Sequence, residues 1–212
     1  MPDRGRHRSL AWALLAVIAA AGALVVVLSP AERTLGQAVK VVYVHVALSR
    51  AGAVGLYAAG LLGLAVIAWP AERLAWWMRA VAWAGLSLFA LGFAVSGLAQ
   101  WLSWGGITWR EPRVAAGANV LAVALIVQIA NGWLPWLRLR GVLRLLVAGL
   151  QLWTTLRAPN VLHPGDAIRS SGSAAIINAN SLLFLLALLL GAGIVALLWL
   201  YRAPEPAGPA HR

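Results

Sequence analysis

The chain has 212 residues, of which 62% are hydrophobic and 11% are charged, and its mean hydropathy is +0.82. Soluble domains carry about 25% charged residues, so this composition excludes an ordinary soluble domain. The absence of cysteine excludes thiol redox chemistry, disulfides and thiolate metal sites. The net charge of +11 is explained by arginines that flank membrane spans, so no nucleic-acid partner is expected.

The apolar residues are concentrated in long segments that contain no charged residue. These segments are Leu10–Ser29, Ala51–Ala71, Ala80–Trp109, Val114–Leu137 and Ser170–Tyr201. About 20 apolar residues at 1.5 Å each cross the ~30 Å hydrocarbon layer of a bilayer as a helix. We therefore expect an all-α, polytopic protein in contact with membrane lipids, with one integral membrane domain over residues 1–212.

Six transmembrane helices are predicted in chain order. They cover residues 9–29, 41–69, 80–102, 114–133, 141–156 and 174–201. The fifth is short, about 24 Å, and requires the side chain of Arg144 to snorkel towards the membrane surface; a five-helix arrangement with this segment lying flat is the alternative. Asn178, Asn180 and Ser181 are expected to form hydrogen bonds between helices, and the proline-rich tail 203–212 is expected to be disordered.

The distribution of positive charges predicts the orientation. With the N-terminus inside, ten Lys and Arg residues fall on inner segments and seven on outer ones. The positive-inside rule then predicts that both termini, including the basic residues 1–9, face the cytoplasm. The seven outer positive charges also indicate an outer face that can attract an anion.

Two of the four histidines, His45 and His163, are expected at the outer membrane face. Together they could bind one metal ion or one haem iron through neutral imidazole nitrogens. The alternative is a hydrogen-bonding histidine at the interface and an ordinary histidine in a loop. Arg50 follows five residues after His45 in an apolar helix. A charge inside a membrane segment is energetically costly, which makes a functional role for Arg50 one hypothesis; snorkelling of its side chain to the head groups is the simpler explanation.

Tryptophan is abundant, with twelve residues against three Tyr and three Phe. Seven of them fall at inner helix ends, where tryptophan is common in membrane proteins. Trp101, Trp104 and Trp109 lie close together in an outer segment that continues into Arg110 and Arg113. Such a loop could stack on a flat macrocycle while the arginines pair with its carboxylates, or it could dip into the membrane. No phosphate loop, paired carboxylates or activated nucleophile is present, so the sequence does not predict an enzyme.

Three segments resemble the CcmC-like family of haem-handling cytochrome c maturation proteins. Lys40–Val46 resembles the Tyr-x-His-Val signature of that family, and Trp104–Arg113 resembles its tryptophan-rich WWD segment. Trp153–Leu156 resembles the Trp-x-Thr-Leu that precedes its second histidine. The resemblance covers the chain from about residue 40 to its end. In the tryptophan-rich segment Thr108 and Arg110 stand where the family carries Trp, and the acidic position is Glu111.

The resemblance implies that haem b is held at the outer face of a bacterial inner membrane and presented for cytochrome c maturation. The partners it implies are a haem chaperone and the ATPase and permease subunits of an ABC-type complex. His45 is the implied first axial ligand. Arg157 occupies the position of the second. His163, six residues later, is the expected second ligand if the loop has lengthened, and which of the two positions faces the iron stays open. The remaining implied contacts are Trp101, Trp104 and Trp109 around the ring and Arg110, Arg113, Arg50 or Arg157 at the propionates. The alternative function is a six-span permease subunit of an ABC-type exporter that binds no haem.

Overall fold

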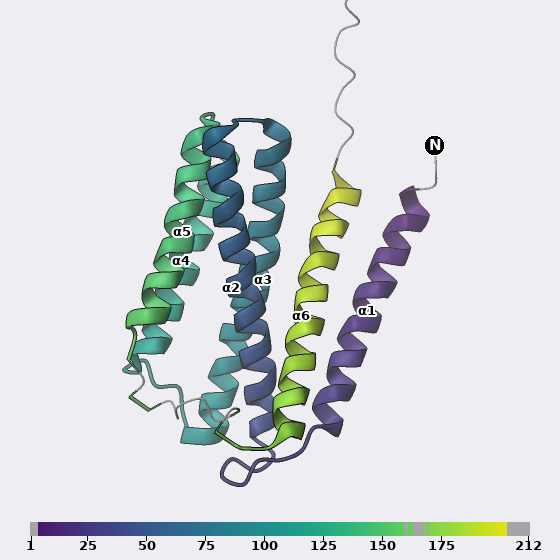
Figure 1. Ribbon diagram of the computed structural model, residues 1–212, viewed down its shortest axis with the longest axis vertical. Helices are drawn as coiled ribbons and strands as arrows, with labels where there is room; N and C mark the ends of the chain where they lie inside the picture. The colour runs from purple at the N-terminus through teal and green to yellow at the C-terminus, as the bar shows by residue number, and fades with distance from the viewer. Residues whose placement is uncertain (1–3, 160, 163–167, 169, 203–212) are drawn as a thin grey trace, which may run out of the picture.

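The computed structural model describes residues 4–159, 161–162, 168 and 170–202, and these residues form six α-helices and no β-strand (Figure 1). The helices are α1 (Arg4–Leu28), α2 (Val39–Ala68), α3 (Glu72–Trp104), α4 (Pro112–Trp133), α5 (Leu137–Arg157) and α6 (Ala174–Tyr201). The all-α prediction is confirmed, and each predicted helix is present. The tail that the sequence predicts to be disordered, 203–212, lies outside the described residues.

Five of these helices are long and apolar enough to cross a membrane. The candidate spans are Gly5–Leu28, Val39–Ala68, Glu72–Trp104, Pro112–Trp133 and Ala174–Tyr201. The exception among the described helices is α5, whose sequence includes Arg138, Arg140 and Arg144. Nevertheless, α5 runs alongside α2 and α4 (Figure 1), and its 21 residues extend about 31 Å at 1.5 Å per residue. It therefore lies along the bundle rather than across it.

Helix α2 is central, and small residues let its neighbours approach it closely. On the side of α3, a Cβ added to Gly52 would lie 2.4 Å from the backbone nitrogen of Phe89, and one added to Gly55 would lie 2.6 Å from the Cα of Gly85. On the side of α5, a Cβ on Gly63 would lie 2.7 Å from the carbonyl oxygen of Gly141. Backbone contacts of this kind hold helices together in membranes, where the hydrophobic effect contributes little to helix association.

Arg144 points into the bundle, so the prediction that its side chain snorkels to the surface is wrong. Only 2% of the residue is exposed, and its guanidinium donates a hydrogen bond to the side-chain oxygen of Gln128 on α4. The amide nitrogen of Gln128 in turn donates to the backbone oxygen of Arg79 on α3, at 3.3 Å. The close contact of α5 with α2 turns this face of α5 inward, which leaves the arginine no path along the outside of the helix.

The bundle has two ends, which we name by one residue each. The His45 end holds the first turns of α2, α4 and α6, the last turns of α1, α3 and α5, and the loops between them (Figure 1). The Glu72 end holds the opposite termini of all six helices. There the start of α1 meets the end of α6, since Arg8 donates to the backbone oxygen of Leu200 at 3.1 Å. The tryptophans predicted for inner helix ends lie at the Glu72 end. They are Trp12, Trp69, Trp76, Trp77, Trp133, Trp136 and Trp199.

Candidate functional site

The residues singled out by the sequence come from separate elements that all reach the His45 end. His45 is in the second turn of α2, and Trp101 and Trp104 are in the last turn of α3. The loop between α3 and α4 carries Trp109, and Arg157 is the last residue of α5. The fold therefore gathers these segments at one end of the bundle, although not all of their side chains face one another.

The imidazole of His45 is fixed against α3. Its Nδ1 lies 2.9 Å from the backbone oxygen of Gly92, and the Oγ of Ser49 lies 3.3 Å from the same nitrogen. A carbonyl oxygen can only accept, so Nδ1 must carry the hydrogen. The lone pair of the neutral ring is then on Nε2, the arrangement in which a second hydrogen bond orients a metal-binding histidine.

The close approach of α2 and α3 makes this hydrogen bond possible. A Cβ added to Gly92 would lie 2.7 Å from the backbone nitrogen of Ser49, so only glycine fits at position 92 without moving the helices apart. Without a side chain at Gly92, the carbonyl oxygen of α3 comes within reach of His45. The imidazole orientation is therefore set by helix packing rather than by a neighbouring side chain alone.

The tryptophan-rich loop is held by backbone geometry and one amide side chain. Gly105 ends α3 in the left-handed conformation, with φ of +75°, and donates its N–H to the backbone oxygen of Trp101 at 3.0 Å. Glycine adopts this conformation without the steric cost that a Cβ brings. The buried side chain of Gln100 accepts a hydrogen bond from the backbone N–H of Thr108, at 3.0 Å. This contact folds the loop back onto the last turn of α3.

The three tryptophans of this region differ in exposure. Trp101 and Trp109 are each 63% exposed, whereas Trp104 is half-buried. Trp101 follows Gly92 by nine residues, which places it about 180° around α3 from the face that meets His45. Trp101 therefore projects away from the imidazole. The exposed rings are compatible with both interpretations of the loop, as a platform for a flat ligand or as a segment that dips into the membrane.

Glu111 connects two loops, a role that the sequence did not indicate. The residue is completely buried and directly precedes Pro112, the first residue of α4. Its carboxylate accepts hydrogen bonds from the backbone N–H groups of Leu162, at 2.7 Å, and Val161, at 3.4 Å. The only signal in the sequence was an acidic residue at the corresponding position of the WWD segment. The carboxylate joins the tryptophan-rich loop to the segment that immediately precedes residue 163.

The candidate arginines lie on the surface. Arg50, Arg110, Arg113 and Arg157 are all exposed, and the guanidinium of Arg157 lies over the ring of Trp153 at 5.1 Å. Arg50 lies five residues after His45, about 140° around α2 from it, so the two side chains leave the helix in different directions. His163 lies outside the described residues, and so do Asp166 and Arg169 in the same loop.

The loop between α1 and α2 is stabilised by local and tertiary hydrogen bonds. The carboxylate of Glu32 accepts from the backbone N–H of Leu35 at 2.8 Å, and this bond lowers its pKa below the ordinary value of 4.5. Tyr43 donates to the backbone oxygen of Pro30 at 3.2 Å. The amide nitrogen of Asn180 on α6 donates to the backbone oxygen of Tyr43 at 3.4 Å. These contacts join the loop to α2, and α2 in turn to α6.

The polar patch at the start of α6 is confirmed in part. Asn180 is buried and forms the predicted bond between helices. Ser181 instead donates to the backbone oxygen of Ile177 in its own helix, at 2.9 Å, and Asn178 is exposed. The difference follows from helical periodicity, because Asn180 is on the inner face of α6 while its two neighbours in the patch are turned outward.

The chain matches no family model and no curated protein. Its helices nevertheless define a class. Five of them have the length and apolar composition of membrane spans, and the described chain folds entirely as helices. The protein is an α-helical, multi-pass membrane protein.

Proposed function

We propose that this protein binds haem b at the His45 end and presents it for cytochrome c maturation, in a bacterial inner membrane. The proposal rests on the resemblance of three segments to CcmC-like proteins, and these segments converge at one end of the bundle. The observation that carries it is the orientation of His45, whose Nδ1 lies 2.9 Å from the backbone oxygen of Gly92. A hydrogen on Nδ1 makes Nε2 the nitrogen that would bind iron. In this proposal the protein is a carrier and catalyses no reaction.

Six spans and a cytoplasmic Glu72 end belong to the same proposal. Helix α5 is long enough to cross, and its most deeply placed cation, Arg144, has a hydrogen-bond acceptor within the bundle. A charge that is paired in this way is less costly in a membrane than an unpaired one. The excess of Lys and Arg at the Glu72 end favours its cytoplasmic placement. The His45 end then faces the periplasm, where a haem chaperone and the subunits of an ABC-type complex are the proposed partners.

The chemistry of the residues at the His45 end fits haem in several respects. His45 supplies an imidazole nitrogen for the iron, and Trp104 and Trp109 supply aromatic rings for the porphyrin. The exposed cations Arg110 and Arg113 suit the propionates. When haem is bound, its iron supplies the coordination chemistry, while these residues bind and orient the ring. Arg157 itself cannot be an axial ligand, because its guanidinium stays protonated, so His163 is the proposed second ligand.

Replacing His45 by alanine tests the proposal. We expect the purified variant to retain several-fold less haem than the wild type, because one axial bond is lost. His7→Ala is the matched control, since His7 is exposed at the opposite end of the bundle. Recovery of the absorption spectrum of six-coordinate, low-spin iron on adding free imidazole to His45→Ala would separate lost ligation from altered packing. Unchanged haem content in His45→Ala would refute the proposal.

The second axial position is tested by a pair of variants. His163→Ala should convert low-spin haem to a high-spin, five-coordinate form, while Arg157→His should leave the spectrum of the wild-type protein unchanged. Tighter haem binding or a new spin state in Arg157→His would show that residue 157 faces the iron and that His163 is not the ligand.

A further inference from the structure

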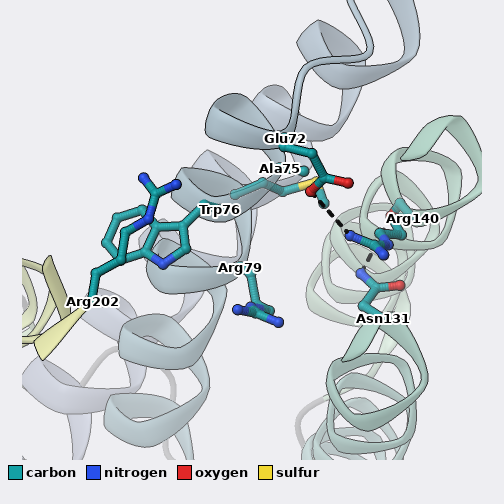
Figure 2. A pocket seen from close by; sticks show the side chains of 8 residues that line it. Glu72, Ala75, Trp76, Arg79, Asn131, Arg140 and Arg202 are labelled. Carbon is teal, nitrogen blue, oxygen red and sulfur yellow. Dashed lines mark hydrogen bonds and ion pairs between the residues drawn. The ribbon is translucent and has the colours of Figure 1, made fainter. Parts of the chain in front are cut away.

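A cavity opens between four helices at the Glu72 end. It measures about 100 Å³, and its lining includes Glu72, Trp76, Arg79, Asn131, Arg140 and Arg202 (Figure 2). One water molecule requires roughly 10–15 Å³ of such space, so the cavity has room for several waters or for one polyatomic anion. Its walls come from α3, α4 and α5, together with the residue that follows α6. The cavity is thus at the opposite end of the bundle from His45.

Positive charge dominates this cavity. Figure 2 shows Arg79 between Trp76 and Arg202 on one side and Asn131 and Arg140 on the other. The guanidinium of Arg79 makes no hydrogen bond or ion pair with any of the described residues. Glu72 is the one carboxylate among the described lining residues, and it pairs with Arg140 at 3.7 Å from a side chain that is 72% exposed. An exposed pair of this length contributes little, so it does not neutralise the cavity.

A buried arginine behind the cavity adds to this imbalance. Arg144 is one helical turn after Arg140 on α5 and only 2% exposed, and the charge of Arg79 repels it. Among the described residues, the Nε of Arg144 has no hydrogen-bond partner, and neither has the side-chain oxygen of Asn131, which is 1% exposed. Buried polar atoms without partners are rare in folded proteins and require an explanation. A bound anion would offset the repulsion, and its hydration water would reach the amide oxygen.

We propose that this cavity binds a phosphate group through Arg79, Arg140 and Arg202, with Arg144 adding to the positive potential. The planar guanidinium fork matches the geometry of phosphate oxygens. Two sources share this chemistry, the head group of an anionic phospholipid and free inorganic phosphate. The head group is the favoured source, because basic pockets between helix ends bind such lipids. The cavity also adjoins a cluster of tryptophan and arginine side chains, and tryptophan is common where a membrane meets water. In that cluster Trp77 stacks on Trp199 at 5.0 Å, and the guanidinium of Arg202 lies 5.3 Å from the ring of Trp76.

Lipid retention and titration with the full-length protein test this site. Delipidated protein in neutral detergent would be titrated with short-chain phosphatidylglycerol, with phosphatidylcholine, or with inorganic phosphate against chloride at equal ionic strength. Binding would be followed by the thermal unfolding midpoint and by native mass spectrometry. Arg79→Gln should weaken binding about tenfold, the loss expected for one charge-assisted contact. Arg138→Gln is the matched control, because Arg138 is exposed on α5 and does not line the cavity.

The outcomes separate the sources and can overturn the proposal. Binding of phosphatidylglycerol that far exceeds binding of phosphatidylcholine, and that is lost in Arg79→Gln, identifies a lipid site. Binding of inorganic phosphate with the same dependence on Arg79 identifies a soluble anion. If no phosphate compound binds, or if Arg79→Gln and Arg138→Gln weaken binding equally, the cavity is not a phosphate site. The haem proposal is unaffected by this result, since it concerns the other end of the bundle.

Discussion

Replacing Gly92 by alanine perturbs the contact between α2 and α3 at the level of His45. The new Cβ would lie 2.5 Å from the Oγ of Ser49 and 2.7 Å from its backbone nitrogen. The hydroxyl can rotate away, but the backbone nitrogen can move only with its helix. Restoring an ordinary contact of 3.4 Å would separate the helices locally by about 0.7 Å, a form of overpacking that costs about 1–3 kcal/mol.

The same displacement acts on the imidazole. The distance from the Nδ1 of His45 to the oxygen of Gly92 would lengthen from 2.9 Å to about 3.6 Å, which is too long for a hydrogen bond. Losing this bond lowers the stability of the folded protein by about a further 0.5–1.5 kcal/mol. Gly92→Ala should therefore lower the thermal unfolding midpoint by several degrees, at about 2–4 °C per kcal/mol for a chain of this size. Haem retention should fall as well, because the orientation of the ligand is lost.

The control for this experiment is Gly149→Ala. Gly149 is in the middle of α5, and a Cβ added there would have no atom of the described residues within 4 Å. Its substitution should leave stability unchanged or raise it slightly, since alanine is the better helix former. An unfolding midpoint for Gly92→Ala equal to that of the wild type, or an equal loss in both variants, would refute the packing argument.

Further substitutions test the buried polar contacts and the loops. Gln128→Leu should lower the free energy of unfolding by about 1–3 kcal/mol, because the guanidinium of Arg144 loses its acceptor. Arg144→Met should lower it less, because the buried charge is removed together with its need for a partner. Equal decreases of the thermal unfolding midpoint in the two variants would contradict this. Glu111→Ala should speed hydrogen exchange of residues 161–162 about tenfold, since their backbone donors lose a charged acceptor; unchanged exchange would mean that the carboxylate does not hold this loop. The pKa of Glu32 is lower in the folded protein than its ordinary value of 4.5. The ionised carboxylate therefore stabilises the fold at pH values above 4.5, and this stabilisation is lost as the pH falls through the pKa of the folded state. Acidification over that range should therefore open the loop between α1 and α2 in the wild type and not in Glu32→Gln, as measured by hydrogen exchange corrected for the intrinsic effect of pH.

The helices were predictable because long charge-free runs have few alternatives to a membrane helix. Their ends were less predictable. The third helix was expected to begin at residue 80 and begins at Glu72, and the first was expected at residue 9 and begins at Arg4. In both, charged residues were taken as the limit of the helix. Such residues limit only the apolar segment, because a helix continues through the head-group region with its charged side chains in water.

The orientation of buried polar residues could not be predicted from the sequence. Arg144 and its acceptor Gln128 are on different helices, 16 residues apart, and they meet because α5 packs against both α2 and α4. Glu111 finds its two backbone donors 50 and 51 residues further along the chain. A sequence pattern reveals that such a residue is polar in an apolar context, but its partner depends on how the helices are placed relative to one another.

The absorption spectrum of the purified wild-type protein tests the central claim most directly. The protein would be isolated from haem-replete cells, and oxidised and reduced spectra would be recorded together with a chemical haem assay. Our account predicts a Soret band with sharp low-spin features and nearly one haem per chain, since two imidazoles favour low-spin iron. A colourless protein that also fails to take up added haem would contradict the account and favour a permease subunit that binds none.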